Sequence, residues 1–137
     1  MAQTAIILVR MFPMCRAVVN DPAVTFNLFL MLAMGHLVGD FALQSDRMAV
    51  EKCPGCDVVL SWRWWLTAHA AIHGFLVAWI TGVPLLGLAE WGIHTFIDLG
   101  KCRGLYRLNT DQFLHILCKA LWAGLATIPM FASGWRG

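Results

Sequence analysis

Each of the five histidines in this chain has a polar partner four residues away within an apolar stretch. The pairs are His36 with Asp40, His69 with His73, His94 with Asp98, and Asp111 with His115. Residues four apart lie on the same face of a helix, so each stretch presents two polar side chains to its neighbours. Imidazole nitrogens and carboxylate oxygens together bind divalent transition metals. The pattern therefore predicts a metal site assembled from four helices.

Depth along these helices sorts the residues into layers. A helix rises about 1.5 Å per residue, and depth is counted along each helix from the end that bears the connections at 45–61 and 100–110. On this count, one of the polar residues of each helix lies about 8 to 9 Å deep. We expect these four to be primary ligands: Asp40, His69, His94 and His115. His36 and His73 fall one layer deeper, as further ligands or as residues that orient the first layer. The expected cofactor is a divalent cation, zinc first, with manganese or iron as alternatives.

Two carboxylates lie nearest the connections. Asp98 and Asp111 are expected near the surface, where either one would serve as a general base. Glu90 and Lys119 fall at the depth of the second layer. Lys119 either pairs with Glu90 or extends to the membrane surface. Glu90 otherwise serves as a ligand, a base or a hydrogen-bond partner of a neighbouring helix.

The same residues also fit roles other than a divalent metal site. Polar side chains inside a membrane bundle act as interhelical hydrogen-bond partners or as a proton relay. Facing histidines in a four-helix bundle also ligate haem iron, although the carboxylate partners argue against haem.

The composition places this chemistry in a membrane. Hydrophobic residues make up 59% of the 137 residues and charged residues only 13%, which is typical of integral membrane proteins. We expect an all-α fold, an integral membrane four-helix bundle at 21–137, with spans at 24–44, 62–80, 85–99 and 111–131. Asp21 and Pro22 mark the start of the first span. Residues 1–20 hold an apolar run too short to cross a bilayer and are expected to form an N-terminal interfacial extension.

The charges predict orientation rather than a charged partner. A net charge of +2 gives no reason to expect nucleic acid as a partner. Lysine and arginine gather in the two connections on the side of the metal site: Arg47, Lys52, Lys101, Arg103 and Arg107. The positive-inside rule therefore predicts that these loops face the cytoplasm.

The cysteines carry less information. Cys53 and Cys56 form one C-x-x-C, which we interpret as an incidental loop pair because no second pair at a suitable spacing exists. Cys15, Cys102 and Cys118 are interpreted as small packing residues.

At the histidine motifs the chain resembles the small bacterial and phage membrane proteins classed as domain of unknown function 3307. The matching strings are GHLVGDFALQ at 35–44, HAAIH at 69–73, HTFID at 94–98 and DQFLH at 111–115. A more distant likeness extends to inner-membrane proteins described as metal-dependent hydrolases. The resemblance implies a bacterial inner-membrane location and a hydrolytic reaction. Residues 1–20 and the 53–56 loop depart from the family pattern.

Site and resemblance together favour a membrane-embedded, metal-dependent hydrolase that acts on a lipid or another amphiphile. Gln44 and Gln112 are expected to hydrogen-bond the substrate, and Arg103 and Arg107 to hold an anionic head group. The alternatives are a non-enzymatic accessory subunit with a structural metal, in a larger membrane complex or a homo-oligomer, and an oligomeric transporter or proton relay. An open coordination position facing a cavity would favour catalysis, and a closed one a structural metal.

Overall fold

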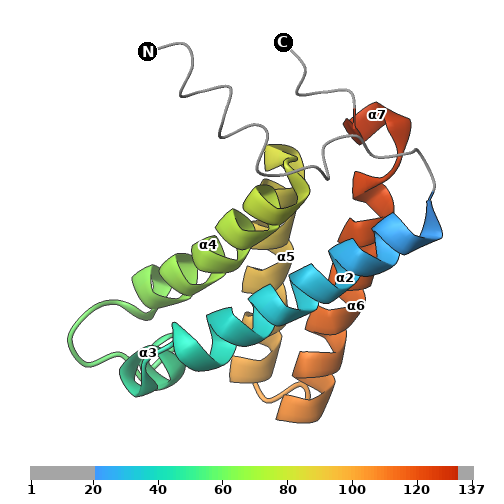
Figure 1. Cartoon of the computed structure of the whole chain (residues 1–137). Coiled ribbons are helices and arrows are strands. Elements are labelled where there is room, and N and C mark those ends of the chain that lie inside the picture. The colour runs from blue at the N-terminus through green and yellow to red at the C-terminus, as the bar shows by residue number, and fades with distance from the viewer. Residues whose placement is uncertain (1–20, 133–137) are drawn as a thin grey trace, which may run out of the picture.

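The computed structural model describes residues 21–132, and every regular element among them is helical, as the sequence predicts. Four long helices run alternately in opposite directions (Figure 1). They are α2 (Pro22–Leu37), α4 (Trp62–Thr81), α5 (Pro84–Cys102) and α6 (Leu108–Ala126). Two short helices, α3 (Asp46–Glu51) and α7 (Pro129–Ala132), flank them, and a π-helical segment, η2 (Val38–Ala42), extends α2. The predicted interfacial extension at 1–20 lies outside the described residues.

Local sequence signals set the helix ends. The Asp21 carboxylate accepts a hydrogen bond from Ala23 N at 2.8 Å and Pro22 follows it, which confirms the predicted start of α2. Helix α4 ends at Gly82, whose φ of 69° is left-handed and favours glycine. Pro84 then starts α5. The two helices are therefore joined by a tight connection and lie antiparallel.

Two glycines let α4 and α5 approach closely. A Cβ atom on Gly74 would lie 2.7 Å from the Gly87 carbonyl oxygen, and a Cβ on Gly87 would lie 2.5 Å from the Gly74 carbonyl oxygen. Any side chain at either position would push the two backbones apart. Small residues at a helix contact allow this kind of close packing.

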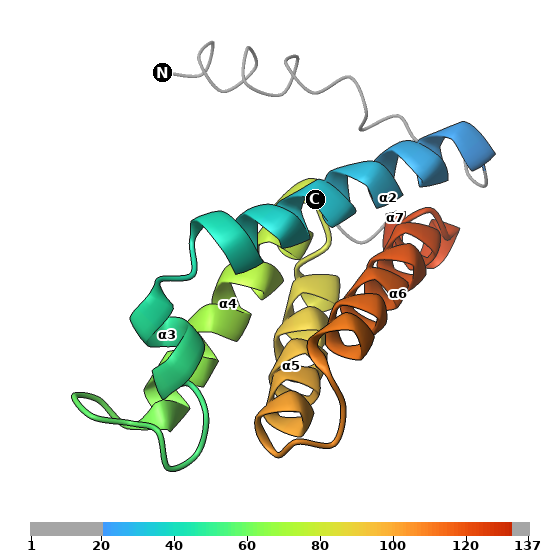
Figure 2. The same ribbon diagram turned by 90° about the horizontal axis from the view of Figure 1, so that it is seen from below.

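The helices form a four-membered bundle. Helix α2 packs against α4 and α6, and α5 packs against the same two helices, so α2 and α5 lie diagonally opposite (Figure 2). The predicted polar connection at 45–61 contains α3. Ser45 caps this helix by accepting from Met48 N at 3.2 Å.

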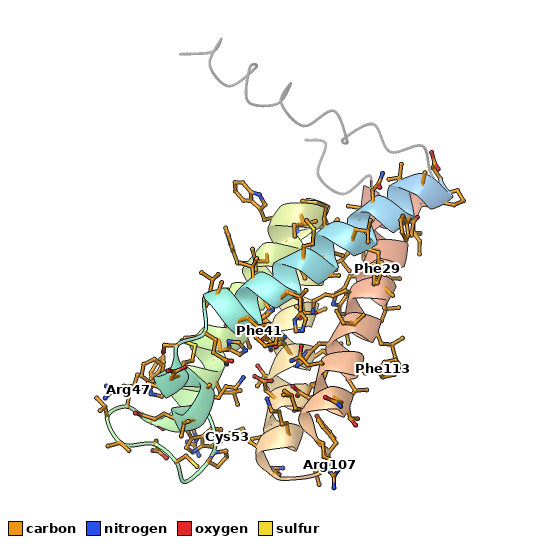
Figure 3. All side chains as sticks on the ribbon, turned by 60° about the horizontal axis from the view of Figure 1, so that its bottom comes forward. Phe29, Phe41, Arg47, Cys53, Arg107 and Phe113 are labelled. Atoms are coloured by element: carbon orange, nitrogen blue, oxygen red, sulfur yellow. A yellow bond between two sulfur atoms is a disulfide. The ribbon has the colours of Figure 1, made fainter. Side chains whose placement is uncertain are left out.

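The interior divides into two halves along the helix axes. In the half near the start of α2, an apolar core joins all four long helices: Leu32, Val77, Val83, Leu86, Trp122, Ala123 and Ala126. In the other half, nitrogen and oxygen atoms of side chains gather between the helices, on the side of Phe41 and Cys53 (Figure 3). The second half contains the candidate functional site.

Candidate metal centre

The polar half of the bundle brings together eight side chains with metal-ligating atoms, drawn from η2 and the four long helices. They are His36, Asp40, His69, His73, His94, Asp98, Asp111 and His115. The five histidines are at most 1% exposed. The structure therefore brings together every residue that the sequence singled out as a ligand or base.

The first donor group contains Asp40, His69, His73 and His94. Asp40 Oδ1 lies 3.3 Å from His69 Nε2 and 3.1 Å from His73 Nε2, and His94 Nε2 lies 3.3 Å from His69 Nε2. Ligands placed tetrahedrally around zinc at about 2.0 to 2.1 Å stand about 3.3 to 3.4 Å from one another. The spacing of these donor atoms fits such a site.

Helix geometry at Asp40 contributes to this arrangement. The wider turns of η2 carry Asp40 inward at the end of α2, and π-helical turns are frequent at functional sites. Gly39 precedes it and leaves room for His73, because a Cβ there would lie 2.7 Å from His73 Nε2. Gln112 donates to Asp40 Oδ2 at 2.7 Å and so fixes the carboxylate.

The grouping differs from the predicted layers. His73, expected one layer deeper, belongs to the first group, whereas His115 lies with Asp98 and Asp111 and, in a further grouping, with His36 and His94. His36 Nε2 is held by Gln112 Oε1 at 3.1 Å. The stacked rings of His94 and His115, with centroids 4.1 Å apart, connect the two groups.

Asp98 and Asp111 are not near the surface, as the sequence suggested, but 2% and 1% exposed. Lys52 Nζ lies 2.5 Å from Asp98 Oδ2, and Lys101 Nζ lies 3.5 Å from Asp111 Oδ2. Helix counting placed these carboxylates at the open end of the bundle. Lys52, at the end of α3, covers Asp98, and the expected surface position is wrong for that reason.

Glu90 is the centre of a buried network between the two halves. Its Oε1 accepts from Lys119 Nζ at 2.6 Å and from His94 Nδ1 at 3.1 Å, and its Oε2 accepts from Trp122 Nε1 at 2.5 Å. The predicted Lys119–Glu90 pair is confirmed. Nδ1 of His94 donates its hydrogen to Glu90. In the neutral ring, Nε2 therefore carries no hydrogen and directs its lone pair toward His69.

Several donor atoms of the cluster make no well-aligned hydrogen bond among the described residues, although Asp40 Oδ1 and His73 Nε2 lie 3.1 Å apart. In the first group these are Asp40 Oδ1 and both ring nitrogens of His73, and in the second group Asp111 Oδ1 and both ring nitrogens of His115. Leaving a buried polar atom unpaired costs about 1 to 3 kcal/mol. A bound cation would remove that cost, so the residues present fit a divalent metal.

The two glutamines expected at the substrate instead contact the cluster. In the amide orientation that satisfies both its polar atoms, Gln44 donates to the Asp40 carbonyl oxygen at 3.2 Å and accepts from Lys52 Nζ at 2.8 Å. Gln112 bonds both Asp40 and His36. Both therefore contact candidate ligands rather than a substrate position.

A disulfide and a buried glutamate hold α3 over the polar end. Cys53 is bonded to Cys102, so the interpretation of Cys102 as a packing residue is wrong, whereas Cys56 is a free thiol and the Cys53–Cys56 motif is not a bonded pair. Burial raises the pKa of the Glu51 carboxyl, but donors at Val59 N, Val58 N and Trp65 Nε1 outweigh it and hold that pKa below its usual range. Both contacts keep Lys52 beside Asp98.

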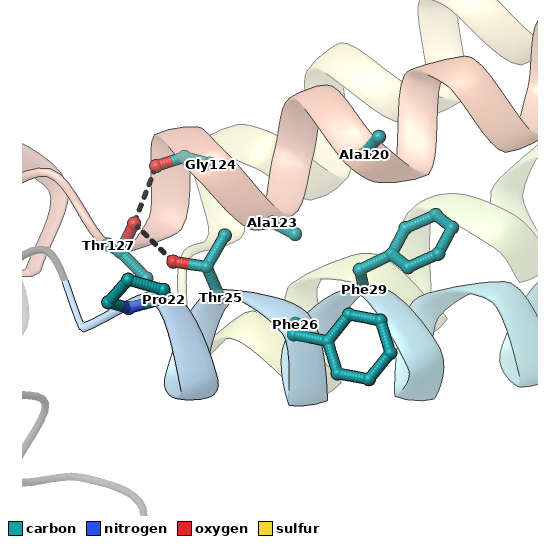
Figure 4. Close-up of a pocket in the computed structure, with 8 residues that line it drawn as sticks. All are labelled: Pro22, Thr25, Phe26, Phe29, Ala120, Ala123, Gly124 and Thr127. Atoms are coloured by element: carbon teal, nitrogen blue, oxygen red, sulfur yellow. Dashed lines mark hydrogen bonds between the residues drawn. The ribbon is translucent and has the colours of Figure 1, made fainter.

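A groove of about 520 Å³ lies at the other end, between α2 and α6 (Figure 4). Phe29 and Ala123 contribute to its apolar lining, and Thr25 Oγ1 donates to Thr127 Oγ1 at 3.3 Å. Its lining contains no acid, base or histidine. The groove therefore contains none of the candidate site residues.

The histidine cluster draws on all four motifs noted in the sequence. A family model described as protein of unknown function (DUF3307) matches residues 28–132, which include every residue of the cluster. The chain belongs to this family. No curated protein and no solved structure shows a significant match to it.

In this DUF3307 chain, sequence reasoning missed part of the site. Lys52 and Lys101 were counted only as loop charges, and the role of Trp122 beneath Glu90 was not foreseen. A lysine next to a cysteine in the connection offers no periodic pattern that would indicate burial. These contacts depend on how α3 folds back over the bundle.

Proposed function

We propose that this protein is an integral membrane protein that holds a divalent cation inside a four-helix bundle. The observation that carries the proposal is the first donor group, in which Asp40, His69, His73 and His94 converge at metal-ligand spacing with unpartnered buried atoms. Three imidazoles and one carboxylate suit zinc best, with manganese and iron as alternatives.

The distribution of side chains supports the membrane location. The buried residues include most of the charged and histidine side chains of the helices, whereas large apolar side chains point outward, among them Phe26, Phe41, Trp79, Phe96 and Phe113, which are 59–74% exposed. A lipid surface is the environment in which such an exterior is stable. Each of the four helices would then turn its apolar side chains toward the lipid and its proposed ligands toward the other helices.

Helix length and composition add to this. Among the described residues, the helical stretch Pro22–Ala42 is the one that is long and apolar enough to cross a membrane on those criteria. Helices α4, α5 and α6 have 20, 19 and 19 residues, close to the roughly 20 needed to span a bilayer. Their inward-facing polar residues lower their mean hydropathy.

Hydrolysis of a lipid or another amphiphile is the reaction we propose. A bound divalent cation lowers the pKa of a coordinated water and so supplies a nucleophile at neutral pH. Asp40 is the most accessible ligand, with its side chain 10% exposed, and marks the approach to the centre. Arg103 and Arg107 are exposed in the adjoining connection and suit an anionic head group.

A structural metal is the second candidate, favoured by a specific observation. His69 and His94 are 0% exposed and His73 is 1% exposed, which is the closed environment typical of structural sites. In that case the cation would stabilise a non-enzymatic membrane subunit, alone or in a larger assembly.

The first test is elemental analysis of the protein purified in detergent without chelators. We expect about one or two equivalents of zinc, manganese or iron per chain, lost in the variant His69→Ala with His94→Ala. The matched control is Asp57→Asn, which changes an exposed carboxylate in a connection. Absence of stoichiometric metal would overturn the proposal, and iron with a Soret band would replace it with haem.

Chelation separates the two candidates. For a structural metal, removal of the cation lowers the unfolding midpoint strongly, and vesicles of anionic phospholipid are not hydrolysed by the loaded protein. For a hydrolase, the loaded protein releases fatty acid, head group or phosphate from such vesicles, and the double variant does not.

A further inference from the structure

A second donor group lies beside the first. His115 Nε2 is 3.5 Å from Asp98 Oδ1 and 3.7 Å from Asp111 Oδ1. All three side chains are at most 2% exposed, and both His115 Nε2 and Asp111 Oδ1 have no hydrogen-bond partner among the described residues. Two carboxylates and one imidazole form a donor set richer in oxygen than the first group. Such a set favours a harder cation such as Mn²⁺.

The two lysines leave the inner oxygens of this group free. Lys52 Nζ takes Oδ2 of Asp98, and Lys101 Nζ takes Oδ2 of Asp111. In each carboxylate it is Oδ1 that is directed toward His115. The lysines therefore orient the carboxylates without occupying the side of His115.

Asp98 also contacts the first group. Its Oδ2 lies 3.5 Å from His69 Nε2 and 3.8 Å from His94 Nε2, whereas its Oδ1 faces His115. A carboxylate with one oxygen toward each of two donor groups is placed to bridge two cations, provided that Oδ2 shares its two lone pairs between the first cation and Lys52 Nζ, which lies 2.5 Å away. In two-metal sites the ions stand about 3.5 to 4 Å apart.

We propose that the bundle binds a second divalent cation through Asp98, Asp111 and His115, with Asp98 bridging it to the first. The inference rests on the proposed metal function and deepens it. Asp98 and Asp111 then act as ligands rather than as the general bases expected from the sequence. Their two charges are balanced by Lys52 and Lys101, so the second cation binds more weakly than the first.

The test is a Mn²⁺ titration of metal-free protein in detergent, read by bound Mn²⁺ per chain and by electron paramagnetic resonance. We expect two equivalents, the second bound at least about tenfold more weakly, and a spectrum of two exchange-coupled ions at saturation. Asp111→Asn should bind one equivalent at the tight site. His73→Asn should lose the tight site, and Asp57→Asn should behave as the wild type.

Loss of the second equivalent in Asp111→Asn would also follow if that variant failed to fold. A second variant, in which the affinity for the second cation should rise, removes this ambiguity. Lys101→Met removes a partly exposed ammonium from Asp111 and should tighten the second equivalent about tenfold, which a merely structural role for Asp111 would not produce. One uncoupled equivalent in the wild type, unchanged in Asp111→Asn and lost in His73→Asn, overturns the second site and leaves the proposed function standing. No bound Mn²⁺, zinc or iron in the wild type overturns the proposed function itself.

Discussion

The same four helices build two halves of opposite character. In one half, Leu32, Val77 and Leu86 pack as an ordinary apolar core, and in the other half His69 and His94 are buried to the same extent. Burial of apolar surface stabilises the first half in proportion to its area. Burial of polar groups costs free energy unless each finds a partner. The bundle therefore depends on packing at one end and on paired charges at the other, where the proposed cation would add to them.

The boundary between the halves is the network around Glu90. Trp122 belongs to the apolar core, yet its indole N–H donates to Glu90, which also pairs with Lys119 and His94. One carboxylate thus joins packing residues to ligands. Variants on either side of it should separate stability from cation binding.

The largest effect is expected where α4 and α5 touch, because both halves share this contact. In Gly87→Leu the new side chain would meet the Gly74 carbonyl oxygen and Ala78 Cβ, at 2.5 and 2.6 Å from its Cβ. We expect no folded protein, measured as the monodisperse fraction in detergent gel filtration. Gly92→Leu, on the same helix, is the control because nothing lies within 4 Å of its Cβ position. Equal recovery of the two variants would contradict the close contact.

Removal of the boundary carboxylate should affect both halves in different ways. Glu90→Leu leaves Lys119 buried without a counter-charge, which costs about 3 to 5 kcal/mol of stability. The double variant Glu90→Leu with Lys119→Met should recover part of that stability in denaturant titrations. Its cation affinity should stay about 10 to 100 times lower, because His94 Nδ1 still lacks an acceptor. Recovery of affinity together with stability would show that Glu90 does not position His94.

A smaller and purely local effect is expected at Gly39. In Gly39→Ala the Cβ displaces the His73 ring, which is the far end of a side chain, so the fold tolerates the change. We expect cation affinity to fall at least about tenfold in competition with a chromophoric chelator, at nearly unchanged unfolding midpoint. Gly124→Ala, with nothing within 4 Å, serves as the control. Unchanged affinity would remove His73 from the first donor group.

The smallest effect is expected from pH at Glu51, outside both halves. Its folded pKa lies below the usual value of 4.5, so its contribution to stability is complete above pH 4.5 and is lost as pH falls through the folded pKa. In Glu51→Gln, the unfolding midpoint should fall less than in the wild type as the pH is lowered below 4.5. In Asp57→Asn, the midpoint should fall with pH as it does in the wild type.

The sequence predicted the helices and the membership of the cluster, because a four-residue spacing of polar side chains is a property of single helices. It did not predict the grouping of His73 with Asp40. Counting 1.5 Å per residue treats helices as parallel rods. Histidine side chains one turn apart nevertheless reach the same point, as His69 and His73 do around Asp40.

Contacts between residues far apart in the sequence were not predictable from spacing within a helix. The short helix α3 lies within the 45–61 connection, and the cover that Lys52 forms over Asp98 and the bond between Cys53 and Cys102 require this connection to fold back against the end of α5. Lys52 and Asp98 are 46 residues apart in the sequence, and Cys53 and Cys102 are 49 residues apart. No periodicity within a helix carries that information.

The Cys53–Cys102 bond also bears on the compartment that the polar end faces. Disulfides persist in the periplasm, whereas bacterial cytosol keeps most thiols reduced. In an inner membrane this bond favours a periplasmic polar end, the reverse of the orientation predicted from lysine and arginine. Labelling of the exposed Cys56 thiol in intact cells by a membrane-impermeant maleimide would show this orientation. A cation bound at this centre would then exchange with the periplasm, so that external metal supply rather than cytosolic metal would govern its occupancy.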